Sequence, residues 1–267
     1  MPRSIRRRVA VASWRPSRDG RIYTRAAIDA TALLRYVEQQ RVCSGERVTI
    51  THVVGAALAR ALTDTPEIRA RVVLGRIVPY RGIDVAFAVD IEGGEDLAPV
   101  KVADAHLKSP VQICREVSPR LSALRTGQDR GHRRSTWFVR VCPGPLLRPL
   151  LAVAGFVIGG LGRPALGQLG SPLGTAFVSN VGTLGLDEAF LAPLPFARCP
   201  LYLAVGAVRD APVVVEGQVA VRPQLVLVAT ADHRLVDGAH AGVIARTLRS
   251  LLADPDRLDA LGDSAPW

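Results

Sequence analysis

Residues 224–238 of this chain read QLVLVATADHRLVDG. The valine-rich and leucine-rich start, residues 224–230, has the composition of a strand, and residues 239–252 have the pattern of a helix. His233 therefore lies between a strand and a helix, where its side chain can point into a cleft. Histidine has the unperturbed pKa nearest neutrality, and acidic residues lie on both sides of this one. We therefore interpret His233 as a positioned base.

Further strands and helices are predicted on both sides of this stretch. The predicted strands are residues 9–14, 23–29, 76–80, 83–90, 97–102, 175–180 and 201–208. The predicted helices are residues 31–40, 51–62 and 109–124. Ser109 and Pro110 supply an N-cap and a first-turn proline for the third helix. Turns are expected at residues 93–96 and around Glu216 and Gly217.

The composition is that of a globular protein with an arginine-rich charge. The chain has 267 residues, a net charge of +10 and 48% hydrophobic residues, which fits one large or two small domains. Among its 34 basic residues only Lys101 and Lys108 are lysines. An anionic partner or a GC-rich genome would each explain this bias. We favour codon bias in a GC-rich genome, because the arginines are spread along the chain and no nucleic-acid-binding motif accompanies them. No nucleic-acid partner is therefore expected.

The four cysteines include no C-x-x-C pair, so neither a zinc site nor a disulfide framework is expected. The basic start of the chain is followed by too short an apolar run for a secretory signal. These features predict a cytoplasmic protein without a metal. The remaining histidines are interpreted as structural: His52, His106, His132 and His240.

Residues 127–170 differ from the rest of the chain. They contain a basic run at residues 130–134 and fourteen consecutive uncharged residues, 149–162. An apolar helix needs about 20 residues to span a bilayer, so this run is too short. We favour a helical hairpin that packs on the same or a neighbouring subunit. The alternative is a segment that contacts a membrane surface through residues 130–170.

Several motifs, in their order and spacing, resemble the catalytic domain of the 2-oxo acid dehydrogenase acyltransferases, the E2 components. The strongest are Ser179-Asn180-Val181-Gly182 and the run from Asp232-His233-Arg234 to Asp237-Gly238, followed by LAVGA at residues 203–207 and VVVEG at residues 213–217. The resemblance covers nearly the whole chain. It implies an α+β fold, the chloramphenicol acetyltransferase-like two-layer sandwich, with a mixed sheet and helices on one side.

The resemblance also implies a reaction, the transfer of an acyl group between coenzyme A and a thiol. The expected thiol is a dihydrolipoyl group on a separate protein. Such a transfer needs a base for the thiol proton and a donor for the tetrahedral oxyanion. The family's motifs assign these roles to His233 and Ser179. They assign Asp237 the positioning of the histidine loop, through an ion pair with an arginine that the sequence does not identify.

The chain also departs from the family. Family members carry a lipoyl domain, with a lysine in an Asp-Lys-Ala turn, and a subunit-binding domain, whereas neither Lys101 nor Lys108 lies in such a turn. We therefore expect residues 1–267 to form a single catalytic domain, without those two domains and with an insertion at residues 127–170. The resemblance implies a homotrimer and leaves open whether trimers assemble into a larger cage. Two alternatives remain: a non-catalytic E2-like scaffold that docks a partner or a membrane, and coenzyme A-dependent acylation of a small-molecule acceptor.

Overall fold

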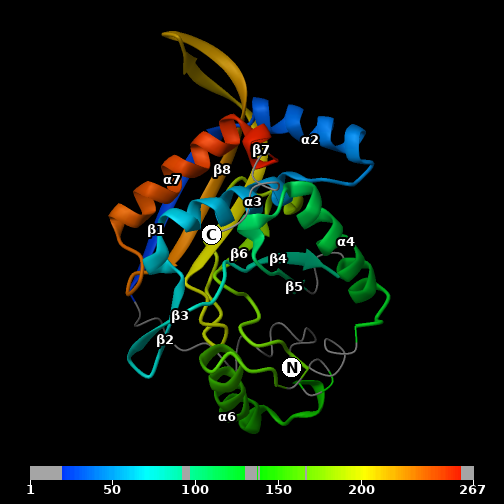
Figure 1. Ribbon diagram of the computed structural model, residues 1–267, viewed down its shortest axis with the longest axis vertical. Coiled ribbons are helices and arrows are strands. Elements are labelled where there is room, and N and C mark those ends of the chain that lie inside the picture. The colour runs from blue at the N-terminus through cyan, green and yellow to red at the C-terminus, as the bar shows by residue number, and fades with distance from the viewer. Residues whose placement is uncertain (1–19, 92–96, 130–136, 138, 166, 260–267) are drawn as a thin grey trace.

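A six-stranded mixed sheet forms the centre of the molecule (Figure 1). The computed structural model describes residues 20–91, 97–129, 137, 139–165 and 167–259. The strand order is β1-β8-β7-β6-β4-β5; β6 runs parallel to β4 and β7, and the other neighbours are antiparallel. The strands are β1 (Arg21–Asp29), β4 (Val85–Asp90), β5 (Leu97–Val102), β6 (Ala176–Asn180), β7 (Leu201–Val215) and β8 (Gln218–Asp232).

Four helices cover one face of this sheet (Figure 1). They are α2 (Thr31–Ser44), α3 (Ile50–Ala61), α4 (Pro110–Arg125) and α7 (Gly238–Ala253). Helix α3 is almost entirely buried, because it consists largely of small and β-branched residues that let the other helices and β4 approach closely. Alternate strand residues such as Leu201, Leu203 and Val205 face these helices and complete the main core. The predicted two-layer α+β architecture is confirmed.

The other face of the sheet is covered by the chain between β6 and β7. Tyr202 and Ala204 of β7 point to this side and pack against hydrophobic residues of that segment. Part of this β6–β7 segment reaches the edge strand β1, where Glu188 pairs with Arg25 and the Phe190 ring packs edge-on against the Tyr23 ring. A separate hairpin of β2 (Ala70–Val73) and β3 (Arg76–Pro79) lies beside the end of this segment, since the Tyr80 hydroxyl donates to the Arg198 carbonyl at 3.0 Å.

The insertion packs on the same chain. It contains α6 (Gly144–Gly155) and a π-helical turn, Phe156–Gly160. A Cβ added to Gly159 would lie 1.9 Å from the carbonyl oxygen of Phe196, so only glycine permits this contact. Arg71 of β2 also donates to the Gly160 carbonyl at 3.0 Å. In the part of the chain that is described, no helix has the length and apolarity needed to cross a membrane.

Most predicted elements are present, and the differences are local. Strands β7 and β8 have 15 residues each and extend well past their predicted limits, so the turn end of their hairpin projects from the sheet (Figure 1). Strand β2 was not predicted. The predicted strand at residues 9–14 and the turn at residues 93–96 lie outside the described residues.

Candidate active site

His233 lies in the loop between β8 and α7, the setting that the sequence predicted. Its backbone N–H donates to the Gly20 carbonyl at 3.2 Å, and its Nδ1 lies 2.7 Å from the carbonyl oxygen of Val236. A carbonyl oxygen can only accept, so Nδ1 carries the hydrogen and the lone pair of the neutral ring is on Nε2. The side chain is exposed, so a bound thiol can reach that nitrogen.

Asp237 is the N-cap of α7. Its Oδ1 accepts the backbone N–H of His240 at 3.0 Å and lies 2.9 Å from the Nδ1 of the same residue. The hydrogen bond from the His240 backbone, more than any other contact, holds the pKa of Asp237 below its ordinary value. Among the described residues, Asp237 therefore pairs with His240, and the expected arginine pair is not found. The carboxylate fixes where α7 begins, and thereby the end of the His233 loop.

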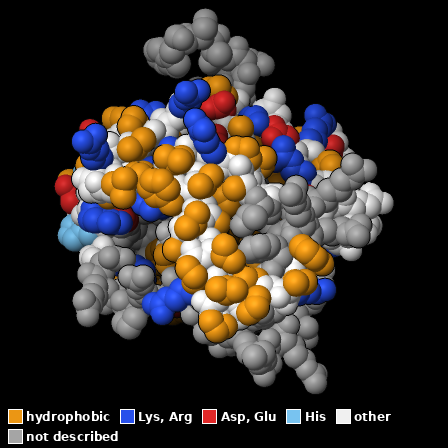
Figure 2. Space-filling view, turned by 90° about the horizontal axis from the view of Figure 1, so that it is seen from below, with side chains coloured by type: hydrophobic (Ala, Val, Ile, Leu, Met, Phe, Trp, Pro, Cys, Tyr) orange, Lys and Arg blue, Asp and Glu red, His pale blue; other side chains and the backbone are white. Residues whose placement is uncertain are grey.

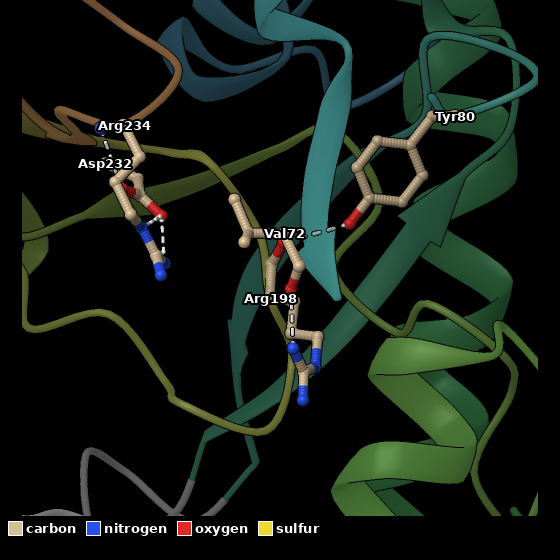
Figure 3. A network of polar contacts seen from close by, with 5 residues as sticks. All are labelled: Val72, Tyr80, Arg198, Asp232 and Arg234. Atoms are coloured by element: carbon tan, nitrogen blue, oxygen red, sulfur yellow. Dashed lines mark hydrogen bonds and ion pairs between the residues drawn. The ribbon is translucent and has the colours of Figure 1, made fainter. Parts of the chain in front are cut away.

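The arginine of the motif, Arg234, binds the other acidic residue. Its Nε lies 2.9 Å from Oδ1 of Asp232, and a terminal nitrogen lies 2.6 Å from Oδ2 (Figure 3). Burial raises the pKa of Asp232, but the hydrogen bonds from Arg234 outweigh it and the net pKa is lowered. Asp232 thus stays ionised. Its ion pair with Arg234, made through two hydrogen bonds, fixes the backbone on both sides of His233.

Ser179 is buried in β6, where its backbone pairs with Ala204 of β7. Its neighbour Val178 packs in the core under the helices, so Ser179 points to the opposite face of the sheet. Asn180 ends the strand, and its Nδ2 donates to the hydroxyl of Thr51 in α3 at 2.8 Å. This bond anchors the strand end that carries Ser179 to the helix layer.

Close backbone contacts explain why the motifs at residues 179–182 and 203–207 contain glycine. A Cβ on Gly182 would lie 2.5 Å from the carbonyl oxygen of Gly206, and a Cβ on Gly206 would lie 1.9 Å from the carbonyl oxygen of Asp187. The chain that follows Ser179 therefore crosses β7 with backbone against backbone, which larger residues would prevent.

The structure does not bring Ser179 and His233 together within one chain. Ser179 pairs with Ala204, which pairs with Val228 of β8, so these three residues form one row across the sheet. His233 lies five residues beyond Val228 along the chain. With a rise of ~3.4 Å per residue and ~4.8 Å between strands, the two candidate residues are about 20 Å apart. One copy of the chain therefore does not place these two candidate residues close enough to contact the same bound acyl group.

A group of arginines beside the His233 loop was not predicted from the sequence. It consists of Arg21, Arg71, Arg198 and Arg234. These residues come from four separate segments and carry no spacing pattern, so only the folded chain shows that they lie together. Among the described residues, no cluster of His, Cys, Asp or Glu side chains is arranged to hold a metal ion.

Two curated relatives illustrate the sequence similarity. The dihydrolipoyllysine-residue succinyltransferase of the Saccharomyces cerevisiae 2-oxoglutarate dehydrogenase complex is 34% identical over 85 residues, 32% of this chain and 18% of that protein. The dihydrolipoyllysine-residue acetyltransferase of the Mycoplasma capricolum pyruvate dehydrogenase complex is 25% identical over 221 residues, 82% of this chain and 41% of that protein. The match thus spans less than half the length of either relative.

Solved structures share the fold at low identity. A probable dihydrolipoamide acetyltransferase from Listeria monocytogenes 4b F2365 has a TM-score of 0.67 at 18% identity, covering 98% of this chain and 93% of that one. The dihydrolipoamide acetyltransferase of Azotobacter vinelandii gives 0.65 at 18%, covering 90% and 84%. A chloramphenicol acetyltransferase gives 0.52 at 15%, covering 93% and 94%.

The family model for the catalytic domain of 2-oxoacid dehydrogenases acyltransferases matches residues 6–130 and 172–259. The unmatched residues between these segments nearly coincide with the segment that differs in composition. The matched segments include Ser179, His233 and Asp237. The resemblance noted in the sequence is thereby confirmed, and the chain belongs to the 2-oxoacid dehydrogenases acyltransferase (catalytic domain) family.

Proposed function

We propose that this chain transfers an acyl group between coenzyme A and a dihydrolipoyl thiol carried by a separate protein. The observation that carries the proposal is the bond from His233 Nδ1 to the Val236 carbonyl, which leaves Nε2 as the basic nitrogen in an exposed loop. In this family such a nitrogen serves a thiol-dependent reaction, since the thiolate is the nucleophile.

The proposed steps conserve protons and acyl groups. His233 Nε2 removes the proton of the attacking thiol, and the thiolate adds to the thioester carbonyl. The hydroxyl of Ser179 donates a hydrogen bond to the resulting oxyanion. The intermediate then expels the second thiolate, which takes its proton back from the imidazolium. Asp237 acts by positioning, through the cap of α7.

The Azotobacter vinelandii structure supports this assignment. It belongs to a study of a serine, a histidine and an asparagine in the catalytic mechanism of that acetyltransferase, the asparagine four residues after the histidine. In this chain Ser179 precedes His233, and Asp237 stands four residues after it. This chain has an aspartate where that protein has an asparagine. Both side chains can accept an N-cap hydrogen bond, as Asp237 does from His240, but an amide cannot act as a base, so the role that the two residues share is capping.

We further propose that the site forms between two copies of this chain, as in a homotrimer. The separation of about 20 Å between Ser179 and His233 supports this, because both roles are then filled only across a subunit boundary. A related catalytic core forms the cubic core of a pyruvate dehydrogenase complex. Sedimentation of the purified chain distinguishes a trimer from a cage of that kind.

Complementation tests both proposals. His233→Ala and Ser179→Ala are each assayed with acetyl-, propionyl-, succinyl- and branched acyl-coenzyme A and dihydrolipoamide. Loss of the base lowers kcat by ~10²–10⁴-fold. Co-assembly of the two variants in equal amounts restores about a quarter of the wild-type activity, because in a random mixture a quarter of the subunit pairs contribute both intact residues. No recovery on co-assembly contradicts the shared site.

The same assays separate the alternatives. An acyl-transfer rate that is unchanged in His233→Ala contradicts the catalytic proposal, whereas a wild-type chain that neither binds coenzyme A nor transfers an acyl group favours the non-catalytic scaffold. Binding of coenzyme A without any transfer to dihydrolipoamide favours a small-molecule alcohol or amine as the acceptor.

A second role is proposed for the insertion, contact with an anionic membrane surface. Leu146, Leu150 and Val153 form a stripe along α6 and are 56%, 40% and 64% exposed. Hydrophobic side chains gather on this end of the molecule, with Lys or Arg at the margin (Figure 2). Residues 130–186 contain six arginines and no acidic residue. A basic and apolar segment of this kind favours anionic lipid over a protein surface of mixed charge.

Flotation with vesicles of phosphatidylcholine, with and without phosphatidylserine, tests this role. The wild-type chain floats with the anionic vesicles only, and Leu146→Glu with Leu150→Glu abolishes flotation. Val219→Glu, a matched control at an exposed valine of the β7–β8 hairpin, leaves it unchanged. Absence of wild-type flotation with either vesicle removes the proposal, and a change in oligomer size in the double variant instead identifies a subunit contact.

A further inference from the structure

A small cavity with several arginines in its wall lies directly beside the His233 loop. Its volume is about 180 Å³, and its walls come from the start of β1, from β2, from residues 193–199 and from the end of β8. Val72, Pro193, Leu194 and Pro195 form an apolar side. The charged lining residues are Arg21, Arg198, Arg234 and Asp232.

The charges of this cavity are not balanced within the described residues. Asp232 is the only acidic residue among the described residues that line the cavity, and its carboxylate is engaged in the ion pair with Arg234. Arg21 and Arg198 add two further cations. Burial lowers the pKa of Arg198 most, and the positive charges of Arg234 and Arg71 lower it further. A bound anion would relieve this repulsion.

Arg198 is held in place from two sides. Its guanidinium donates to the Val72 carbonyl, and its own carbonyl accepts the Tyr80 hydroxyl at 3.0 Å (Figure 3). Its backbone has a φ of 52°, in the left-handed region that is unfavourable for a residue other than glycine. The Nε is buried and has no hydrogen-bond partner among the described residues. Such a combination of strain and an unpaired donor is typical of binding sites.

The cavity is connected to the proposed base by the backbone. Gly20 lines the cavity, and its carbonyl accepts the N–H of His233. Asp232 and Arg234, the two chain neighbours of His233, also line it. A group bound in this cavity would therefore lie next to the His233 loop.

We propose that this cavity binds a carboxylate or phosphate group of the acyl-transfer substrate through Arg198, Arg21 and Arg234. The identity of the substrate rests on the proposed function, whereas binding of the anion does not. Two sources share this chemistry: the free carboxylate of a dicarboxylic acyl group, and a phosphate of coenzyme A. The planar, multiple donors of arginine suit both.

Calorimetry without any acceptor thiol distinguishes these sources. Acetyl-coenzyme A and succinyl-coenzyme A are titrated into the full chain, into Arg198→Gln and into Arg35→Gln, a control at an exposed arginine of α2. Loss of one charge-assisted hydrogen-bonding group weakens binding about 10- to 100-fold. Weaker binding of both esters identifies a phosphate, and weaker binding of succinyl-coenzyme A alone identifies the acyl carboxylate. Equal affinities for wild type and Arg198→Gln overturn the proposal.

A second variant and a second set of probes keep the result independent of folding and of catalysis. Arg21→Gln removes a cation from the same cavity at the first residue of β1 and replaces Arg198→Gln if circular dichroism shows that the latter is unfolded. Inorganic phosphate and succinate are titrated in parallel. Their binding to wild type, lost in the variant, supports the cavity even if no acyl transfer is found; no wild-type binding of either anion or either ester refutes it.

Discussion

Helix α3 and β4 approach so closely at Gly55 that one methyl group there would collide with Phe87. A Cβ on Gly55 would lie 2.3 Å and 2.4 Å from Cε1 and Cζ of the Phe87 ring, but 3.6 Å from its Cδ1. Phe87 is 1% exposed, so the ring has no room to turn away. Gly55→Ala therefore strains the core of the wild-type chain, whereas Phe87→Leu removes the two ring atoms that cause the collision.

Two opposing contributions determine how much Gly55→Ala changes the free energy of unfolding. Alanine in place of glycine inside a helix stabilises by about 1 kcal/mol. Overpacking a rigid core costs ~1–3 kcal/mol, and contacts this short place the cost near the upper limit. Gly55→Ala thus destabilises the wild-type chain by about 2 kcal/mol. In the Phe87→Leu background the collision is absent, so the same substitution stabilises by about 1 kcal/mol.

Urea unfolding of the four proteins at one concentration measures this double-mutant cycle, with equal denaturant slopes as the check on two-state behaviour. The expected coupling between the two sites is about 3 kcal/mol, with a change of sign for Gly55→Ala. Equal effects of Gly55→Ala in both backgrounds would refute the packing argument.

Three further predictions concern single side chains. Thr51→Val removes the hydrogen bond to Asn180 and lowers kcat about tenfold, equivalent to ~1.4 kcal/mol, in the acyl-transfer assay, whereas Thr51→Ser keeps both bond and rate. Burial lowers the pKa of His52 to about 4, so the unfolded chain protonates first and stability falls as the pH drops from about 6.5 to about 4. His52→Gln preserves the capping box with Thr49 and flattens this slope in denaturation curves; an unchanged slope contradicts the assignment. Ser109→Ala removes the cap of α4 and costs about 1 kcal/mol, seen as a lower Tm with unchanged activity.

Local signals explain most of what the sequence predicted. Ser109 and Pro110 begin α4 as expected, because an N-cap and a first-turn proline act within one helical turn. The outer halves of β7 and β8 were not predicted, since Asp210 and Pro212 are unfavourable in strands. They are extended because each provides the hydrogen-bonding partner of the other.

The candidate site was predictable only where its residues follow one another. His233, its strand and its helix lie in one stretch of sequence, and the structure has them as expected. The N-cap of α7 could also have been predicted from local sequence, because Asp237 stands three residues before His240. The family resemblance instead led us to expect an ion pair between Asp237 and an arginine. Arg198 became visible only in the fold, because the segments that surround it are distant in sequence.

The pairing of β1 with β8 has a consequence for biosynthesis. Arg21 lies opposite Asp232 and Asp29 opposite Gln224, so the strands that form this edge of the sheet are about 200 residues apart. At ~5–20 residues per second, the ribosome needs on the order of 10 to 40 s to make the residues between them. During that time β1 has no partner strand, and neither β1 nor α2 can make its contacts with α7. The nascent chain therefore depends on being kept from aggregation until its last helix emerges, and a truncation before β8 leaves the sheet without its central hairpin.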